Sequence, residues 1–201
     1  MTAFRTSRKF DIIFILVLAL FVVWCAFHRV AIGDKIFFLS YHPNAKTIKI
    51  ADEADFTTTG RTLFYRTNPQ FETASEITAQ CDIERLGCLS PKGQTFILDD
   101  PSKPNQTLVT AAHEMLHLAY ERLSSNKKDE LEPLLDQAVA QNAILGINGE
   151  LESEKTPEDR RDEAHSLLGT EYKNLPPELE TYYSTYFSNR SKILKAAASE
   201  N

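Results

Sequence analysis

The sequence has no excess of basic residues. Lys and Arg together number 22, against 28 Asp and Glu, and no stretch interleaves basic residues with aromatic ones. Proteins that bind nucleic acid carry such basic patches because the phosphate backbone is negatively charged. We therefore expect no nucleic-acid partner. The length of 201 residues is sufficient for one domain of ordinary size and a short additional segment.

Cysteine is also scarce, with three residues in the chain. Cys25 lies in an apolar run, whereas Cys81 and Cys88 are separated by six residues. No His or second Cys pair lies near them, so they do not indicate a zinc site, and they lack the pattern of an inhibitory propeptide cysteine. In an oxidising compartment Cys81 and Cys88 would form a disulfide. Two unpaired thiols are the alternative, because the sequence does not show the distance between their Cα atoms.

The N-terminal region contains one long apolar run, residues 12–27, which follows three basic residues. Flanking residues extend it to the ~20 that a helix needs to cross a bilayer. A buried core helix is one alternative, but a domain of this size rarely encloses a helix on all sides. A cleaved signal peptide is the other, but His28 and Arg29 occupy the places of the small residues at a cleavage site.

We therefore predict that residues 1–32 form a signal anchor and residues 33–201 a separate domain. The positive charge before the span predicts a cytoplasmic N-terminus. The protein would then be a single-pass protein of the cell membrane, in contact with the lipid bilayer, and its domain would be extracytoplasmic.

Beyond the span, the sequence predicts short strands. Three β-prone runs indicate strands at residues 35–41, 47–51 and 60–66. The clearest strand is residues 94–99. Within it, Thr95–Leu98 is either an edge strand, where an extended peptide could pair, or an interior strand of the same sheet.

Helices are predicted on both sides of this strand. A short helix is expected at residues 73–80, and a longer one at 127–145 that Pro133 interrupts near its start. Residues 151–158 are acidic and polar and predict a solvated loop. The aromatic-rich tail predicts a packing helix at residues 176–198.

The pattern His-Glu-X-X-His occurs once, at residues 113–117. On a helix, the step from His113 to His117 advances about 400°, so both imidazoles leave the same face one turn apart. Two ligands of one zinc ion need this geometry. Glu114 is rotated about 100° from His113, so it can flank the metal and take a proton from a metal-activated water.

Residues around this pattern distinguish it from a chance match. The intervening and flanking side chains are uncharged, and no Pro or Gly occurs from residue 105 to 126. A surface helix with two incidental His would normally carry interleaved charges. With Thr110 three residues before His113 and Leu118 after His117, the stretch resembles the active-site helix of zincin metallopeptidases. A structural helix with two incidental His is the alternative.

A catalytic zinc usually has three protein ligands and one open position. The metzincin extension would place a third His at position 123, which is Leu123. Residues 162–166, Asp-Glu-Ala-His-Ser, resemble instead the second motif of the gluzincins, the thermolysin-like peptidases. The resemblance implies Glu163 as third ligand, although Leu167 replaces the Asp that supports a ligand His in that family. His165 and Glu171 are alternative ligands.

The resemblance also implies candidates for transition-state stabilisation. Glu163 and His165 lie about 200° apart on a helix, so both cannot bind one ion. If Glu163 binds, His165 could orient a neighbour or stabilise the oxyanion, or be a structural histidine. Gluzincins often use a Tyr or His for the tetrahedral intermediate; Tyr182, Tyr183 and Tyr186 are candidates here, with simple core packing as the alternative.

These observations predict an α+β fold. The domain would be zincin-like, with a small mixed sheet, an active-site helix and a glutamate helix, behind the transmembrane helix. The resemblance implies a zinc metallopeptidase that hydrolyses a peptide or protein substrate, with Zn²⁺ held by His113, His117 and Glu163 and with Glu114 as general base. Two alternatives are a membrane-anchored binding or assembly module with a structural or vestigial zinc, and a non-catalytic membrane protein with a chance motif.

Overall fold

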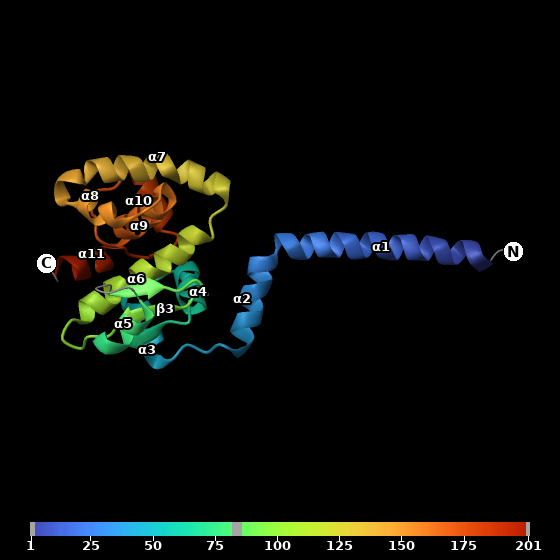
Figure 1. Ribbon diagram of the computed structural model, residues 1–201, viewed down its shortest axis with the longest axis horizontal. Helices are drawn as coiled ribbons and strands as arrows, with labels where there is room; N and C mark the ends of the chain where they lie inside the picture. Colours follow the sequence, from blue (N-terminus) through green and yellow to red (C-terminus); the bar gives the residue numbers. More distant parts are fainter. Residues whose placement is uncertain (1–2, 82–85, 200–201) are drawn as a thin grey trace. The chain divides into compact units, whose positions relative to one another are not determined.

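The computed structural model describes the backbone of residues 3–81 and 86–199, and side chains from residue 10 onward. The chain divides into two units, Met1–His42 and Pro43–Asn201 (Figure 1). The predicted boundary at residue 33 falls inside a helix of the first unit. The residues between Cys81 and Leu86, which lie within the predicted disulfide loop, are outside the described residues.

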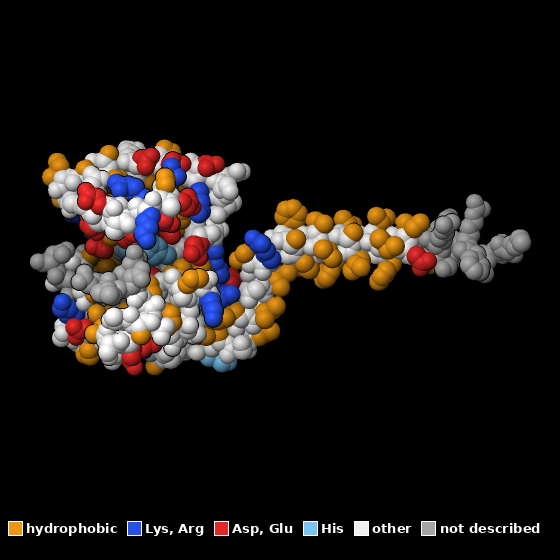
Figure 2. Space-filling model, in the orientation of Figure 1, with side chains coloured by type: hydrophobic (Ala, Val, Ile, Leu, Met, Phe, Trp, Pro, Cys, Tyr) orange, Lys and Arg blue, Asp and Glu red, His pale blue; other side chains and the backbone are white. Residues whose placement is uncertain are grey.

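The first unit consists of the helices α1 (Ala3–Phe27) and α2 (Arg29–Ser40). Within α1, the 18 residues Phe10–Phe27 are long and apolar enough to cross a membrane. Apolar side chains cover this helix along its described length (Figure 2). The strand predicted at residues 35–41 is wrong, because the chain remains helical there and the rings of Phe37 and Tyr41 stack one turn apart with centroids 4.7 Å apart.

The second unit contains a three-stranded sheet of β1 (Gln70–Glu72), β2 (Gly87–Leu89) and β3 (Thr95–Leu98). The strand order is β1-β3-β2; β1 pairs with β3 in parallel and β2 in antiparallel orientation. The strand predicted at residues 94–99 is confirmed. Of the two positions left open for Thr95–Leu98, the interior one is confirmed, because β3 lies between the other two strands. β1 and β2 were not predicted, since three residues are too few to display alternation.

The other two predicted strands are also wrong, because both segments are capped helices. In α3 (Ala45–Glu53) the Asn44 side chain accepts a hydrogen bond from the backbone of the first turn. Thr57 does the same for α4 (Thr58–Arg66). These caps satisfy amide groups that a helix otherwise leaves without partners. The short helix predicted at residues 73–80 is confirmed as α5 (Ala74–Gln80).

Most of the remaining chain is helical. The main helices are α6 (Pro104–Glu121), α7 (Ser125–Gln141) and α9 (Pro157–Thr170). Pro133 lies inside α7 without ending it. A short helix α8 (Ile147–Glu150) and two 3-10 turns, η1 (Ala143–Leu145) and η2 (Leu151–Ser153), connect α7 to α9. The expected solvated loop is therefore partly wrong, since Leu151 is only 1% exposed.

The C-terminal segment forms two helices, α10 (Pro177–Tyr183) and α11 (Ser191–Ala198), where one was predicted. The chain leaves the helical path because Phe187 forms a β-bridge with Phe56 and packs its ring in the core. This pairing joins the end of the chain to the loop before α4. The periodicity of the tail predicted buried positions correctly but did not predict the interruption between α10 and α11.

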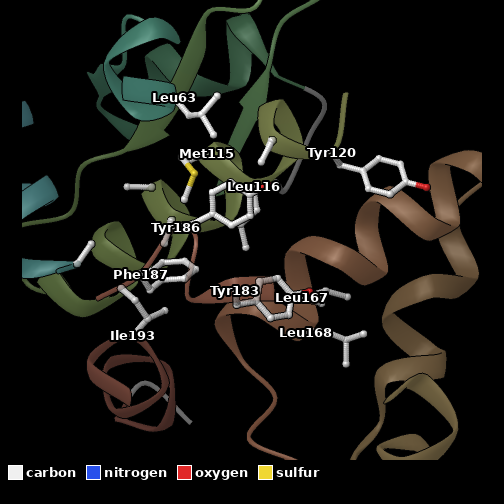
Figure 3. Packing of buried hydrophobic residues seen from close by; sticks show 14 of the residues in the cluster. Leu63, Met115, Leu116, Tyr120, Leu167, Leu168, Tyr183, Tyr186, Phe187 and Ile193 are labelled. Atoms are coloured by element: carbon white, nitrogen blue, oxygen red, sulfur yellow. The ribbon is translucent and has the colours of Figure 1, made fainter. Parts of the chain in front are cut away.

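The helix α6 runs through the middle of this unit. The sheet and α3–α5 lie on one side of α6, and α7–α10 lie on the other (Figure 1). Met115 and Leu116 are fully buried in the core between these layers (Figure 3). At Gly169, α9 approaches α6 so closely that an added Cβ would overlap the Leu116 side chain. Because α6 is enclosed on several sides, close packing fixes its position and rotation relative to the neighbouring elements.

Candidate metal centre

One face of α6 forms the floor of a cleft in the second unit. The side chains on this face recur at intervals of three or four residues: Gln106, Val109, Thr110, His113, Glu114 and His117. The cleft has a volume of about 420 Å³. Side chains from α9 and from the α8–η2 segment form its other walls. In Figure 2, imidazole groups are recessed in a hollow of the second unit with carboxylates near them.

Three side chains in the cleft converge on one point. The Nε2 atoms of His113 and His117 lie 3.1 Å apart. Glu163, which α9 presents, places Oε1 3.4 Å from His113 Nε2 and Oε2 3.5 Å from His117 Nε2. The structure thus brings together the three ligands predicted from the sequence, and this set could hold a metal ion.

The spacing of these atoms suits a small metal ion, and zinc gives a scale for comparison. Four ligands at the usual Zn–N distance of ~2.0–2.1 Å in a tetrahedron lie about 3.3 Å from one another. The 3.1 Å between the two Nε2 atoms lies close to this value, and each of these nitrogens has one Glu163 oxygen at a similar distance, Oε1 at 3.4 Å from His113 and Oε2 at 3.5 Å from His117. Two imidazoles and one carboxylate also form a common donor set for catalytic zinc.

Asp162 adds a fourth polar group that the sequence analysis did not assign. Its Oδ1 lies 2.9 Å from His117 Nδ1. A carboxylate can only accept, so His117 donates through Nδ1–H, and its Nε2 faces the other two candidate ligands. The sequence signal for this role was the pair of adjacent carboxylates, Asp162 and Glu163. On a helix, one of them can bind a metal while the other accepts a hydrogen bond from a ligating histidine.

Charge around His117 favours its protonated form. Burial alone would lower its pKa, but the hydrogen bond to Asp162 and the negative charges of Glu114, Asp162 and Glu163 raise the pKa to about 9. Without metal, His117 therefore carries a proton at neutral pH. A metal ion that binds here must displace that proton, so binding is linked to pH.

Glu114 lies beside the three ligands and is only 5% exposed. The backbone of β2 passes directly next to it: a Cβ at Gly87 would lie 3.0 Å from Glu114 Oε1 and 2.5 Å from Thr110 Cγ2. Glycine is therefore required at this point of β2. The carboxylate of Glu114 faces the cleft from the side of the sheet.

A smaller pocket of about 180 Å³ adjoins the cleft. Both share Glu114, His117, Glu154 and Glu163. Leu86 and Gly87 line the larger cleft, and Cys88 and Leu89 line the smaller pocket. Successive residues of the β2 segment therefore line the two hollows, which share the candidate ligands His117 and Glu163. Cys88 is bonded to Cys81, which confirms the predicted disulfide and ties β2 to the end of α5.

The structure does not bring His165 and Tyr183, the two other candidates for catalysis, into the cleft. Both are 0% exposed and neither lines the cleft. His165 Nε2 shares a hydrogen bond of 2.9 Å with the Tyr182 hydroxyl, and the Tyr183 hydroxyl donates to the backbone oxygen of His165. The hydroxyl groups of Tyr186 and Tyr182 share a further hydrogen bond. These residues form a buried polar cluster behind the site, so packing explains them.

The two alternative ligands, His165 and Glu171, lie outside the group of converging side chains. His165 is turned away from His113 and His117, as expected from its position on α9 relative to Glu163. Glu171 lines the cleft but does not join the three converging side chains. Among the described residues, Glu163 is therefore the third ligand candidate that the geometry supports.

Replacing Asp162 by Asn is expected to flatten the pH dependence of zinc affinity. In the wild type, His117 must lose its proton, so affinity should rise about tenfold per pH unit from pH 7 towards 9. Asn keeps the hydrogen-bond acceptor but removes the charge that raises the His117 pKa. Competition with a chromophoric chelator at several pH values measures this slope. An unchanged slope in the variant would exclude this role for Asp162.

Buried His165 is expected to make the metal-free protein acid-sensitive. Burial, together with His117, His113 and Lys128, lowers its pKa from 6.5 to about 3. The unfolded chain binds a proton below pH 6.5 and the folded chain does not, so stability falls as pH falls from 6.5 towards 3. Between pH 7 and 5, the free energy of unfolding of the wild type should fall by about 2 kcal/mol more than that of His165→Gln. Denaturant unfolding with a chelator present measures the difference; equal losses would contradict it.

Comparison with known proteins finds no match for this chain among protein-family models, curated proteins or solved structures. The assignment of function therefore depends on the geometry of the site.

Proposed function

We propose that this chain is a membrane-anchored zinc metallopeptidase of the gluzincin type. The observation that carries the proposal is the convergence of His113, His117 and Glu163 at zinc-like separations, with Glu114 beside them in a cleft. A structural metal site is normally closed by a fourth protein ligand. Here the three candidate ligands line a cleft, which suits an ion that must contact a substrate.

A zinc ion bound by these ligands would polarise the peptide carbonyl and lower the pKa of a water molecule. Glu114 accepts the proton from that water as it attacks the carbonyl carbon. The same carboxyl group then donates the proton to the amine that leaves when the C–N bond breaks. Asp162 holds the His117 ring in the orientation that directs Nε2 to the site.

The edge strand β2 supplies a place for the substrate backbone. Leu86 O accepts from Leu98 N, and Ser90 N donates to Gln94 O, so alternate residues of this segment bond inward to β3. The intervening residues Gly87 and Leu89 direct their backbone groups away from β3. An extended peptide can pair with this edge by strand addition, which would place its backbone alongside Glu114.

We further propose that α1 anchors the enzyme and that the second unit is extracytoplasmic. Basic residues precede the apolar run, which by the positive-inside rule favours a cytoplasmic N-terminus. The disulfide between Cys81 and Cys88 supports an oxidising compartment for the second unit.

Peptide cleavage by the detergent-purified full chain tests the proposed activity. We expect a mixed peptide library to yield defined products by mass spectrometry, no products after treatment with a zinc chelator, and products again after zinc is restored. Cleavage that continues at full rate in the chelator, or a zinc-loaded chain that cleaves no peptide, would contradict the proposal.

A further inference from the structure

The cleft is acidic well beyond the needs of catalysis. Five glutamates line it, and none of its lining residues is Lys or Arg: the acidic set is Glu114, Glu150, Glu154, Glu163 and Glu171. Glu114 and Glu163 have the roles proposed above. A divalent ion would offset two negative charges, so an excess of carboxylates would remain in the metal-loaded cleft.

Carboxylates elsewhere in the unit are commonly neutralised by a neighbour. Examples of ion pairs between elements are Lys46–Asp99, Lys128–Glu158, Arg161–Glu132 and Arg190–Glu180. Glu150 and Glu171 differ, because neither forms an ion pair with Lys or Arg within the described part of the chain. Glu150 accepts a hydrogen bond from the Tyr172 hydroxyl, which holds its carboxylate in place.

Glu150 and Glu171 line the same cleft. Burial raises the pKa of Glu171; the charge of His113 opposes this shift, and the charges of Glu150 and Glu163 add to it. The two carboxylates come from different elements, α8 and the end of α9, and they face the same hollow. A positive charge placed between them would relieve their repulsion.

The same cleft has apolar walls. Leu86, Val109, Leu167 and Ala197 line it together with the carboxylates. A Lys or Arg side chain has an apolar stem and a charged end, and such side chains lay the stem along apolar surface. The combination therefore fits a long cationic side chain better than a metal ion or a small polar group.

On the basis of the proposed peptidase function, we propose that the enzyme selects peptides with a Lys or Arg side chain, which enters the larger cleft and places its charge against Glu150 and Glu171. These two residues determine specificity and take no part in the proton transfers. Each ion pair at a partly exposed site contributes about two- to fivefold in binding. Together they predict a preference of about fivefold or more over an uncharged side chain.

Matched peptides test this inference on the zinc-loaded full chain in detergent. A single Arg is moved through each position around the cleaved bond of an internally quenched peptide, and each peptide has a partner with uncharged citrulline in place of Arg. We expect the ratio of kcat/KM values, Arg over citrulline, to be at least about fivefold at one position. The ratio should fall to below about twofold in the double variant Glu150→Gln, Glu171→Gln. The control Glu130→Gln removes one negative charge outside the cleft and should keep the wild-type ratio.

Binding separates this inference from the proposed function. The same peptides are titrated by fluorescence anisotropy against zinc-loaded Glu114→Gln. Cleavage without preference for Arg would overturn the inference and leave the peptidase function intact. Preferential binding of Arg peptides, without cleavage by the wild type, would support the charge selection and overturn the peptidase. Equal binding of both peptides would overturn the inference.

Discussion

Replacing Glu114 by Gln is expected to reduce peptide hydrolysis by about 10²- to 10⁴-fold, the usual contribution of a general base. Gln has the same shape, so the buried position next to β2 remains filled. Its amide cannot accept the proton of the attacking water. Because Glu114 is not among the converging ligands, zinc content should remain that of the wild type. Turnover and zinc content measured on the same sample test both expectations.

A matched control lies on the same helix. Glu121 lines the smaller pocket of the site and is an exposed carboxylate. Glu121→Gln removes one negative charge near His117 but no proposed base, so turnover of an uncharged peptide should change by no more than about fivefold. If Glu114→Gln kept its activity, or if both variants lost activity equally, the general-base assignment would be wrong.

Truncating Arg190 to Ala is expected to cause the largest loss of stability. Arg190 is only 7% exposed, and its Nη1 donates to the backbone oxygens of Leu168 and Tyr172. Leu168 lies in the last turn of α9, where helix carbonyls have no intrahelical donor, and Tyr172 lies just beyond the end of the helix. The guanidinium also pairs with Glu180 of α10. Removing it leaves buried carbonyls unsatisfied, which should cost about 3–5 kcal/mol.

Thermal unfolding of the metal-free protein measures this loss. For a chain of this size, the expected change corresponds to a decrease in Tm of about 10 °C. Arg161→Ala is the control, because Arg161 pairs with Glu132 on a partly exposed surface. This substitution should lower the free energy of unfolding by about 1 kcal/mol or less. Similar decreases in the two variants would show that Arg190 does not have the proposed role at the end of α9.

The sequence predicted the site better than it predicted the sheet. The relative positions of His113, Glu114 and His117 depend only on helix geometry, which five consecutive residues specify. The helix that carries Glu163 was recognisable from the DEAHS segment. The distance between the two helices was not predictable, because it depends on close packing such as that of Gly169 against Leu116.

The errors have identifiable physical causes. Segments 47–51 and 60–66 contain β-prone residues, but Asn44 and Thr57 cap them as helices and the sheet forms elsewhere. His165 was considered for catalysis because histidine is chemically versatile. Its burial and its hydrogen bond with Tyr182 arise from the packing of α9 against α10, which the sequence does not display.

Metal content of the purified full chain tests the central claim most directly. The wild type should contain one zinc ion per chain, and His113→Ala and Glu163→Ala should lose it. His165→Ala should retain it, because His165 faces the buried cluster behind the site. A wild-type protein that binds no zinc even after reconstitution would contradict the account. So would a Glu163→Ala variant with unchanged zinc affinity.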